Sequence, residues 1–424
     1  MPGWRDAKVF GLPPGVDFAR ELVAGLRERL IGEPPEAMAR LRLFVNSGRM
    51  QRRVREEFDR QGTGFLPRLH LVSDLSRWPV ANLPPAIPPL RRQLELARLV
   101  EGLARRLPAF ETGTGIFSLA DSLGALMAEM QSEGVRPEAL ERLDIQASHA
   151  EHWRQSLAFI RIVARYFDDT TVPDPDGRQR RVAESLAAQW DETPTQERIV
   201  VAGSTGSRGA TCLLMQAVAR LPNGMLVLPG FDFGMPDHAW NSLYSSKIPI
   251  EDHPQFRFAS LLALLGLPPQ AVLPWTATPP PSAARNALVG LALRPAPVTD
   301  QWMREGQSLG DLTQACAEIE LIEAPTPRAE ALALALALRE AVEVGRKAAL
   351  ITPDRMLTRR VAAALDRWGI VPDDSAGQPL QQTAPGRLMR HVARGLGRRP
   401  DLELVLTLLK HPLIATGSGL RGEH

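Results

Sequence analysis

The sequence is poor in lysine and cysteine and has no long apolar run. Only four of its 50 basic residues are lysine, and the rest are arginine. Its two cysteines, Cys212 and Cys316, form no Cys-x-x-Cys pair, so the sequence supports neither a zinc ribbon nor a disulfide framework. No apolar run reaches the roughly 18 residues that a membrane-spanning helix needs, and the segment from Met1 to Lys8 lacks the apolar core of a signal peptide. We therefore expect a cytoplasmic protein with no membrane partner.

The shortage of lysine also limits nucleotide chemistry. A Walker A phosphate loop needs the pattern Gly-x-x-x-x-Gly-Lys followed by Ser or Thr, placed between a strand and a helix. Lys8 and Lys347 precede predicted strands, and Lys247 and Lys410 stand beside Ile-Pro and His-Pro breaks. Since no lysine follows a strand within a glycine loop, the sequence lacks a P-loop lysine.

Length and charge indicate a globular protein of several units. The 424 residues exceed one ordinary core, and 44% hydrophobic with 23% charged residues is typical of a folded chain. Basic and acidic residues number 50 and 48, so bulk charge gives no nucleic-acid signal and any basic surface must be local.

Alternating strand and helix patterns predict an α/β fold with a doubly wound parallel sheet. Strands are expected at 8–12, 41–45, 69–72, 198–202 and 225–228, with helices at 16–30, 49–60 and 210–220. Residues 88–194 show helical periodicity alone and are predicted to be an inserted helical domain, interrupted by a polar loop at 168–177. A proline-rich connector at 268–281 leads to a second α/β unit with strands at 318–322 and 348–351 and helices at 328–344, 355–368 and 402–409.

The strongest local signal is the glycine-rich loop between the strand at 198–202 and the next helix. Its residues are Gly203, Ser204, Thr205, Gly206, Ser207 and Arg208. Backbone N–H groups at such a helix start can bind phosphate. The glycines at 203 and 209 are too far apart for a Walker A loop, and Arg208 stands in a loop that has no lysine.

Three interpretations of this loop are open. The spacing of Gly203, Gly206 and Gly209, with Asp232 after the next strand, is similar to a dinucleotide-binding unit. Alternatively, Ser204 could be a nucleophile on a strand-to-helix elbow, with His238 or His253 as its base. The third interpretation, favoured because glycine-loop matches are weak alone, is that small residues let strand, loop and helix pack closely.

Other polar clusters give less specific signals. His149 and His152 share a helix face but lack a third zinc ligand, and Asp174 with Asp176 does not continue into a calcium loop. The cluster of Trp240 and residues 251–255 (EDHPQ) is interpreted as a latch between domains rather than a catalytic site. Local basic segments that could contact DNA phosphates contain Arg49, Arg52, Arg53, Arg178, Arg180 and Arg181.

Three long segments together resemble a known family. Residues 200–232, 251–258 and 349–389 are similar to AddB, the second subunit of AddAB-type helicase–nucleases, in its alphaproteobacterial form. The resemblance covers essentially the whole chain. It implies a superfamily-one helicase core with RecA-like domains, divided here as 1–87 and 195–310 for the first RecA-like domain with its connector, 88–194 for the helical insertion, and 311–424 for an incomplete second domain.

The resemblance also implies a function. An AddB-type subunit would pair with the ATP-hydrolysing AddA subunit, bind single-stranded DNA and duplex ends, and scan for a recombination hotspot during double-strand break repair by homologous recombination. Its nuclease residues and iron–sulfur cluster would lie beyond His424, so no metal or cofactor is expected in this segment. The second-domain residues Thr352, Arg355 and Arg359 are added to the predicted DNA contacts.

This chain departs from an active helicase at both ATP-binding elements. The loop after the first strand, where Walker A is expected, contains Gly11, Pro13, Pro14 and Gly15 and has no lysine. The strand at 198–202 is followed by Gly203 and Ser204 instead of the acidic Walker B pair. We therefore predict an inactive helicase fold, with an enzyme that uses a nucleotide or dinucleotide at Gly203–Gly209 as the alternative.

Overall fold

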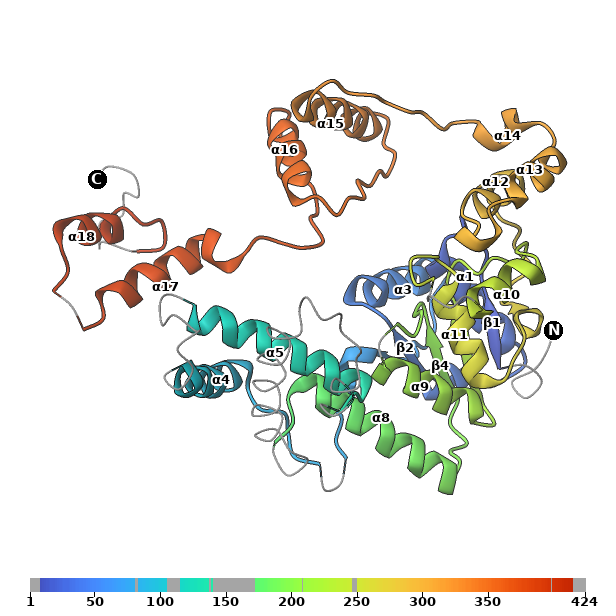
Figure 1. Cartoon of the computed structure of the whole chain (residues 1–424), viewed down its shortest axis with the longest axis horizontal. Helices are drawn as coiled ribbons and strands as arrows, with labels where there is room; N and C mark the ends of the chain where they lie inside the picture. Colours follow the sequence, from blue (N-terminus) through green and yellow to red (C-terminus); the bar gives the residue numbers. More distant parts are fainter. Residues whose placement is uncertain are drawn as a thin grey trace, which may run out of the picture. The chain divides into compact units, whose positions relative to one another are not determined.

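The structure is a computed structural model that describes residues 8–80, 83–104, 115–136, 139, 172–207, 209–245, 250–397 and 399–414. The chain divides into two compact units, unit 1 (residues 1–317) and unit 2 (residues 318–424) (Figure 1). The sequence predicted an α/β fold, and unit 1 confirms it.

A six-stranded sheet forms the centre of unit 1, and all its strands are parallel. The strands lie in the order β3-β2-β4-β5-β1-β6. Their bounds are β1 Val9–Gly11, β2 Arg42–Val45, β3 Arg68–Leu71, β4 Ile199–Ala202, β5 Gly224–Leu228 and β6 Leu273–Pro274. Strands β1 to β5 begin and end within about a residue of the predicted strands. The sheet joins segments that stand more than 200 positions apart in the sequence, since β1 pairs with β5.

Strand β6 corrects one prediction. It lies inside the stretch 268–281 that was interpreted as a connector, and it pairs with β1 through Phe10 and Leu273. A strand of two residues is too short to show the alternation from which strands are predicted. The following Trp275 is fully buried and its backbone N–H donates to the carbonyl of Gly11, which fixes this edge of the sheet.

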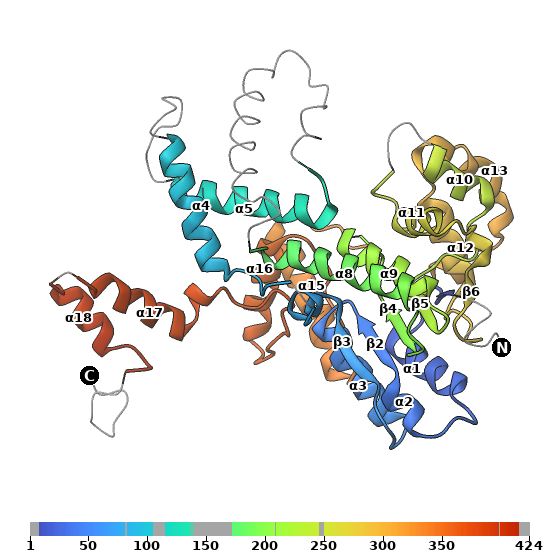
Figure 2. The ribbon, with the colours of Figure 1, turned by 90° about the horizontal axis from the view of Figure 1, so that it is seen from below.

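Helices cover both faces of the sheet because each interior strand alternates its side chains between two cores. On β2, Leu43 and Val45 join the core that includes helix α1 (Phe18–Arg29) and helix α3 (Gly48–Arg60). Phe44 points to the opposite core, which includes helices α8 (Pro175–Glu192) and α9 (Gly209–Arg220). Figure 2 shows this layered arrangement of helix, sheet and helix. The smaller helices of unit 1 before β6 are α2 Glu36–Arg40, α10 Asp237–Ser245 and α11 Phe256–Leu265.

Two helices of the predicted insertion pack against each other. They are α4 (Pro89–Ala104) and α5 (Ile116–Glu133), joined by a small core that includes Leu96, Val100 and Leu123. Helix α8 begins three residues before the predicted start because Asp174 is its N-cap and accepts from the Gly177 N–H at 2.7 Å. The predicted polar loop therefore ends in a helix start, and the helix face expected to carry His149 and His152 lies outside the described residues.

After β6, unit 1 continues in helices that stand over the carboxyl ends of the strands. They are α12 (Ala283–Ala292), α13 (Gln301–Glu305) and α14 (Leu312–Cys316). Short 3-10 turns connect them. None of these helices was predicted, because the segment is rich in alanine and proline and lacks a clear apolar face.

Unit 2 consists of helices in its described part. They are α15 Pro327–Glu343, α16 Arg355–Asp366, α17 Ala384–Gly395 and α18 Leu402–Leu409. The prediction of strands at 318–322 and 348–351 is wrong for this structure: neither segment is a strand, and Leu321 and Ile351 are 87% and 94% exposed. A strand needs a neighbour for its N–H and C=O groups, and the described part of unit 2 pairs these segments with nothing.

Candidate functional site

The loops that follow the six strands meet at one edge of the sheet, called here the carboxyl edge. Parallel sheets bind their ligands at this edge, where backbone groups and helix starts converge. It contains the loop before α1, the loop before α9 and the segment from 229 to 236 after β5. The sequence-predicted nucleotide residues of the first two loops are therefore brought to the same edge.

The loop between β1 and α1 has two features that work against a phosphate cradle. Pro13 and Pro14 have no backbone N–H to offer, and the Pro14 carbonyl accepts a hydrogen bond from the side chain of Asn286 at 3.0 Å. The start of α1 is occupied by Asp17, whose carboxylate accepts from the backbone N–H of Arg20. The chain thus places its own anion where a P-loop protein would place a phosphate.

An arginine neutralises this carboxylate. The Arg53 guanidinium on α3 pairs with Asp17 at 2.6 Å. Partial burial works against ionisation of Asp17, but the hydrogen bonds from Arg53 and Arg20 outweigh it and lower the pKa of Asp17 below its ordinary value of 3.8. Arg53 also contacts Glu57 at 2.6 Å. Arg53, predicted to contact DNA, therefore has a structural role at this position.

The glycine-rich loop before α9 is filled in the same way. Gly203 and Gly206 have φ values of +74° and +68°, a conformation that favours glycine, and the Ser204 hydroxyl accepts from the N–H of Gly206. The first N–H of α9, on Gly209, donates to the carboxylate of Glu133 at 2.8 Å. A Cβ at Gly209 would lie 2.6 Å from the carbonyl of Ser132, so α5 packs directly on this helix start.

These contacts favour the close-packing interpretation of the loop. Thr205 is half-buried and Ser207 exposed, and Arg208 lies outside the described residues. His238 and His253, the two candidate bases for Ser204, hydrogen-bond elsewhere: His238 to Glu305 and His253 to the N–H of Gln255. In the described part of unit 1, neither histidine hydrogen-bonds Ser204.

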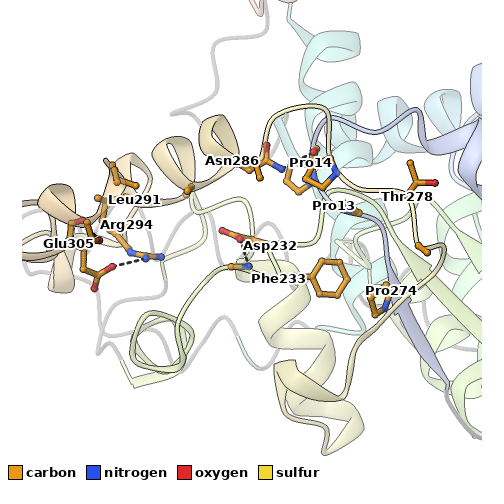
Figure 3. Close-up of a pocket in the computed structure, with 18 of the residues that line it drawn as sticks. Pro13, Pro14, Asp232, Phe233, Pro274, Thr278, Asn286, Leu291, Arg294 and Glu305 are labelled. Atoms are coloured by element: carbon orange, nitrogen blue, oxygen red, sulfur yellow. Dashed lines mark hydrogen bonds and ion pairs between the residues drawn. The ribbon is translucent and has the colours of Figure 1, made fainter. Parts of the chain in front are cut away.

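A cavity of about 560 Å³ opens at the carboxyl ends of β1, β5 and β6 (Figure 3). Part of its wall is formed by Phe233 and by prolines that include Pro13, Pro14 and Pro274. Helix α12 closes the opposite side with Asn286, Gly290 and Leu291, and Arg294 follows just after the helix ends. The cavity therefore occupies the side of the sheet where the degenerate phosphate loop lies, although most of its lining comes from residues beyond 230.

Charged groups gather at one end of this cavity. Arg294 is 9% exposed, and its guanidinium donates to Glu305 at 3.1 Å, while its Nε has no acceptor among the residues the structure describes. Glu305 also contacts His238 at 3.2 Å. Asp232 uses one carboxylate oxygen to accept from the N–H of Gly234 at 2.9 Å. Figure 3 shows Asp232, Arg294 and Glu305 along the same stretch of wall.

The segment 251–255 holds the cavity wall in place through hydrogen bonds to the loop after β5. Gln255 is buried, accepts from the N–H of Asp232 at 3.1 Å and donates to the carbonyl of Gly230 at 2.9 Å. Burial lowers the pKa of His253 below its ordinary 6.5, although the Leu293 carbonyl and Asp232 oppose the shift. Trp240 is buried and stacks on Phe231. The predicted latch thus acts inside unit 1, on the loop after β5.

The predicted DNA-contacting arginines divide into buried and exposed groups. The prediction for Arg178 is wrong, because its buried guanidinium donates to the carbonyls of Ser76, Trp78 and Pro84 at 2.6–2.9 Å. Arg180 is half-buried and bonds Glu184 and the Ser132 carbonyl. Arg49 and Arg52 are exposed on the first turns of α3, beside the carboxyl edge, and Arg181 is half-buried.

The predicted residues of unit 2 lie around the start of α16. The Thr352 hydroxyl accepts from the N–H of Asp354, Arg355 pairs with Asp374 at 3.1 Å, and Arg359 is exposed. Among the described residues, no three histidine, cysteine or carboxylate side chains come together to hold a metal ion. None of the helices that the structure describes could cross a membrane.

Compared with models of protein families and with curated protein sequences, the chain gives no match. Its candidate site therefore rests on geometry. Sequence reasoning named Asp232 as a residue that follows a strand, but it missed Phe233, Asn286 and Arg294, because the segment that carries the last two, α12 and the residues just after it, had no motif of its own.

Proposed function

We propose that this chain is a helicase-fold subunit of an AddAB-type helicase–nuclease that holds single-stranded DNA and does not hydrolyse ATP. A partner of the AddA type would supply ATP hydrolysis and translocation. The six-stranded parallel sheet is compatible with a RecA-like core, which is the fold that the sequence resemblance implies. The function would be part of double-strand break repair by homologous recombination.

One observation carries the proposal: the start of α1 is occupied by a carboxylate from the protein itself. Asp17 accepts the helix N–H of Arg20 and pairs with Arg53, and the preceding loop offers two prolines without N–H groups. A triphosphate at this position would meet Asp17, and the like charges would repel. In the described part of unit 1, Lys8 is the only lysine, and it donates to the carbonyls of Leu221 and Pro222.

Single-stranded DNA fits best beside the start of α3. This helix begins at the carboxyl edge, its first turn has no acidic residue, and it carries the exposed Arg49 and Arg52. The helix dipole and the two guanidinium groups favour a phosphate backbone there. The DNA bases would then face the loops at the carboxyl edge of the sheet.

The dinucleotide alternative has less support. It needs a pyrophosphate at the start of α9, where the Glu133 carboxylate accepts the N–H of Gly209. The two functions differ in what the chain binds. Titration calorimetry with ATP and NAD should give no micromolar binding, and micromolar affinity for either would overturn the proposal.

DNA binding is tested by fluorescence anisotropy with a labelled single strand of thymines at several salt concentrations. Affinity should fall with salt, with a slope of about 0.7 for each phosphate contact. Arg52→Ala should reduce the slope by about that amount. Arg220→Ala is the matched control, because Arg220 is an exposed arginine at the last residue of α9, and that end of the helix lies away from the carboxyl edge. Equal slopes for the two variants would contradict the placement of DNA beside α3.

A further inference from the structure

The cavity beside β1, β5 and β6 has the size and lining of a small-molecule site. Its volume of about 560 Å³ lies within the roughly 300–1,000 Å³ of ligand pockets. Phe233 is 40% exposed, and its ring lies on the cavity wall with Pro13 and Pro274 (Figure 3). An aromatic ring and prolines suit a flat ring system, which gains affinity by stacking.

Two polar groups of the cavity have unused hydrogen-bonding capacity. Asp232 accepts from Gly234 through Oδ1, whereas Oδ2 accepts no hydrogen bond from the residues that the structure describes. A Cβ at Gly290 would lie 2.9 Å from Oδ2, so the glycine in α12 leaves room for this oxygen. Arg294 is nine-tenths buried and its Nε has no acceptor in the same part of the chain. Nε itself is closed to solvent, so a ligand oxygen would reach this guanidinium at Nη1, which donates to none of the residues that the structure describes.

The chemistry of an open carboxylate selects among flat ligands. A carboxylate only accepts, and it binds best to two N–H groups that lie side by side. Guanine offers such a pair, at N1 and its 2-amino group, next to a carbonyl oxygen that can accept from arginine. Adenine and cytosine put a ring-nitrogen acceptor beside their amino group, and thymine places its single N–H between two oxygens. Each of these three bases would put an acceptor against the carboxylate.

We propose that this cavity is a guanine-binding pocket in which Asp232 accepts from the Watson–Crick edge of the base, Arg294 donates to its carbonyl oxygen and Phe233 stacks on its ring. The guanine could come from a free nucleoside or from an unstacked base of a single strand. The second source rests on the proposed function.

The first test is titration calorimetry of the full chain with guanosine, adenosine, inosine and 1-methylguanosine. Guanosine should bind more tightly than adenosine by about 5- to 150-fold, the range for one good bidentate contact. Inosine, which lacks the 2-amino group, and 1-methylguanosine, which lacks the N1 hydrogen, should each lose affinity. Equal binding of all four nucleosides would overturn the proposal. So would a failure to bind guanine both as guanosine and as a base of single-stranded DNA.

Asp232→Asn gives a test with a gain as well as a loss. Its amide oxygen can still accept from Gly234, but its NH₂ group now faces the 2-amino group of guanine. Guanosine affinity should fall at least about fivefold, while xanthosine, which has a carbonyl oxygen in place of that amino group, should bind better than to the wild type. Asp252→Asn, the same change at an exposed carboxylate that does not line the cavity, should alter neither affinity.

Gly290→Ala tests the pocket without removing a polar group. Alanine is the better helix former, so circular dichroism should show an intact fold, but its Cβ would displace Oδ2 of Asp232. Guanosine binding should weaken as in Asp232→Asn. A well-folded variant that binds guanosine normally would show that Oδ2 does not take part.

Two single-stranded DNA oligonucleotides show whether the guanine comes from a DNA base or from a free nucleoside. They also test the guanine pocket separately from the DNA-holding function. A strand of thymines with one central guanine is compared with thymines alone, in the wild type and in Asp232→Asn. A preference for the guanine strand that the variant loses assigns the pocket to a base of the strand; guanosine binding without that preference assigns it to a free nucleoside. Salt-dependent binding of the thymine strand, with neither a guanine preference nor any binding of guanosine, would overturn the pocket and leave the DNA-holding function intact.

Discussion

Two segments of the chain share the same order of apolar run, loop and helix. In unit 1, the run becomes β4, a strand of a sheet that is buried on both faces, and the helix is α9. In unit 2, the segment 348–366 forms the helix α16 but no strand. The backbone of β4 pairs with β2 on one side and β5 on the other. Ile351, in the corresponding run of unit 2, is 94% exposed. An apolar run becomes a strand only where neighbours accept its backbone hydrogen bonds.

The same contrast applies to how each unit holds its helices. Unit 1 has two cores that enclose the sheet, with Trp275, Phe10 and Phe44 among the largest fully buried side chains. The core between α15 and α16 is small and includes Ala331, Ala335 and Val361. We therefore expect substitutions of the same kind to be far more destabilising in unit 1.

The largest difference should come from a pair of tryptophans. Trp275 is fully buried, stacks edge-on against Phe10 and donates to the Leu22 carbonyl, so Trp275→Ala should lower the free energy of unfolding by about 3–5 kcal/mol. Trp368 is half-buried beside Arg339, and its replacement should cost about 1 kcal/mol. Urea unfolding followed by circular dichroism measures both, and equal losses would break the comparison.

A smaller difference should separate two arginines that were both predicted to contact DNA. Arg178→Ala removes a buried group that bonds three backbone carbonyls, and it should destabilise unit 1 by about 2–4 kcal/mol. Arg359→Ala, on an exposed position of α16, should change stability by less than about 0.5 kcal/mol. Thermal unfolding of the two variants checks this. If Arg178→Ala kept its stability and lost only DNA affinity, the structural role of Arg178 would be refuted.

The smallest effect concerns pH and the filled start of α1. The pKa of Asp17 is lower in the folded chain than its ordinary 3.8, so the unfolded chain binds the proton more readily. The carboxylate therefore stabilises the fold above that value, and the benefit is lost as pH falls through the folded pKa. Because the Arg53 and Asp17 side chains are 31% and 44% exposed, solvent screens the pair, and the benefit should be about 0.5–1 kcal/mol.

Asp17→Asn is the variant that measures this contribution. Its stability deficit in urea unfolding should stay constant from pH 7 to about 5 and shrink below pH 4. Glu56→Gln is the matched control, because Glu56 is an exposed carboxylate that lies 3.6 Å from Nη1 of Arg53, whereas Asp17 pairs with Nη2. A deficit that grew toward low pH would show that the sign of the pKa shift is wrong.

Most of the sheet could be predicted because its signals are local. Buried runs such as residues 42–45 and 199–202 have the composition of interior strands, and the loops between them carry proline or glycine. Such local signals did not predict β6, and they wrongly predicted strands in unit 2. The first is only two residues long, and the others depend on partners that the pattern of one segment does not reveal.

The candidate site was predictable only at its loops. Pro13, Pro14 and the glycines at 203 and 206 follow strands, so their position at the carboxyl edge could be inferred. That Glu133 fills the start of α9 could not, because Glu133 comes from the helical insertion, 76 positions away from the Gly209 N–H from which it accepts. The role of Arg178 was misjudged for a similar reason, since a run of arginines looks the same whether it faces solvent or backbone carbonyls.

The sequence by itself determined the absence of a P-loop lysine, since a residue that is not in the chain cannot be supplied by folding. It also determined that strands and helices alternate, because side-chain size and polarity act over a few residues. Only the tertiary structure decided what replaced the phosphate loop. The Asp17–Arg53 pair, the Glu133 carboxylate at the start of α9 and the cavity that Asp232 and Arg294 both line join residues from distant segments, and such contacts depend on how whole elements pack.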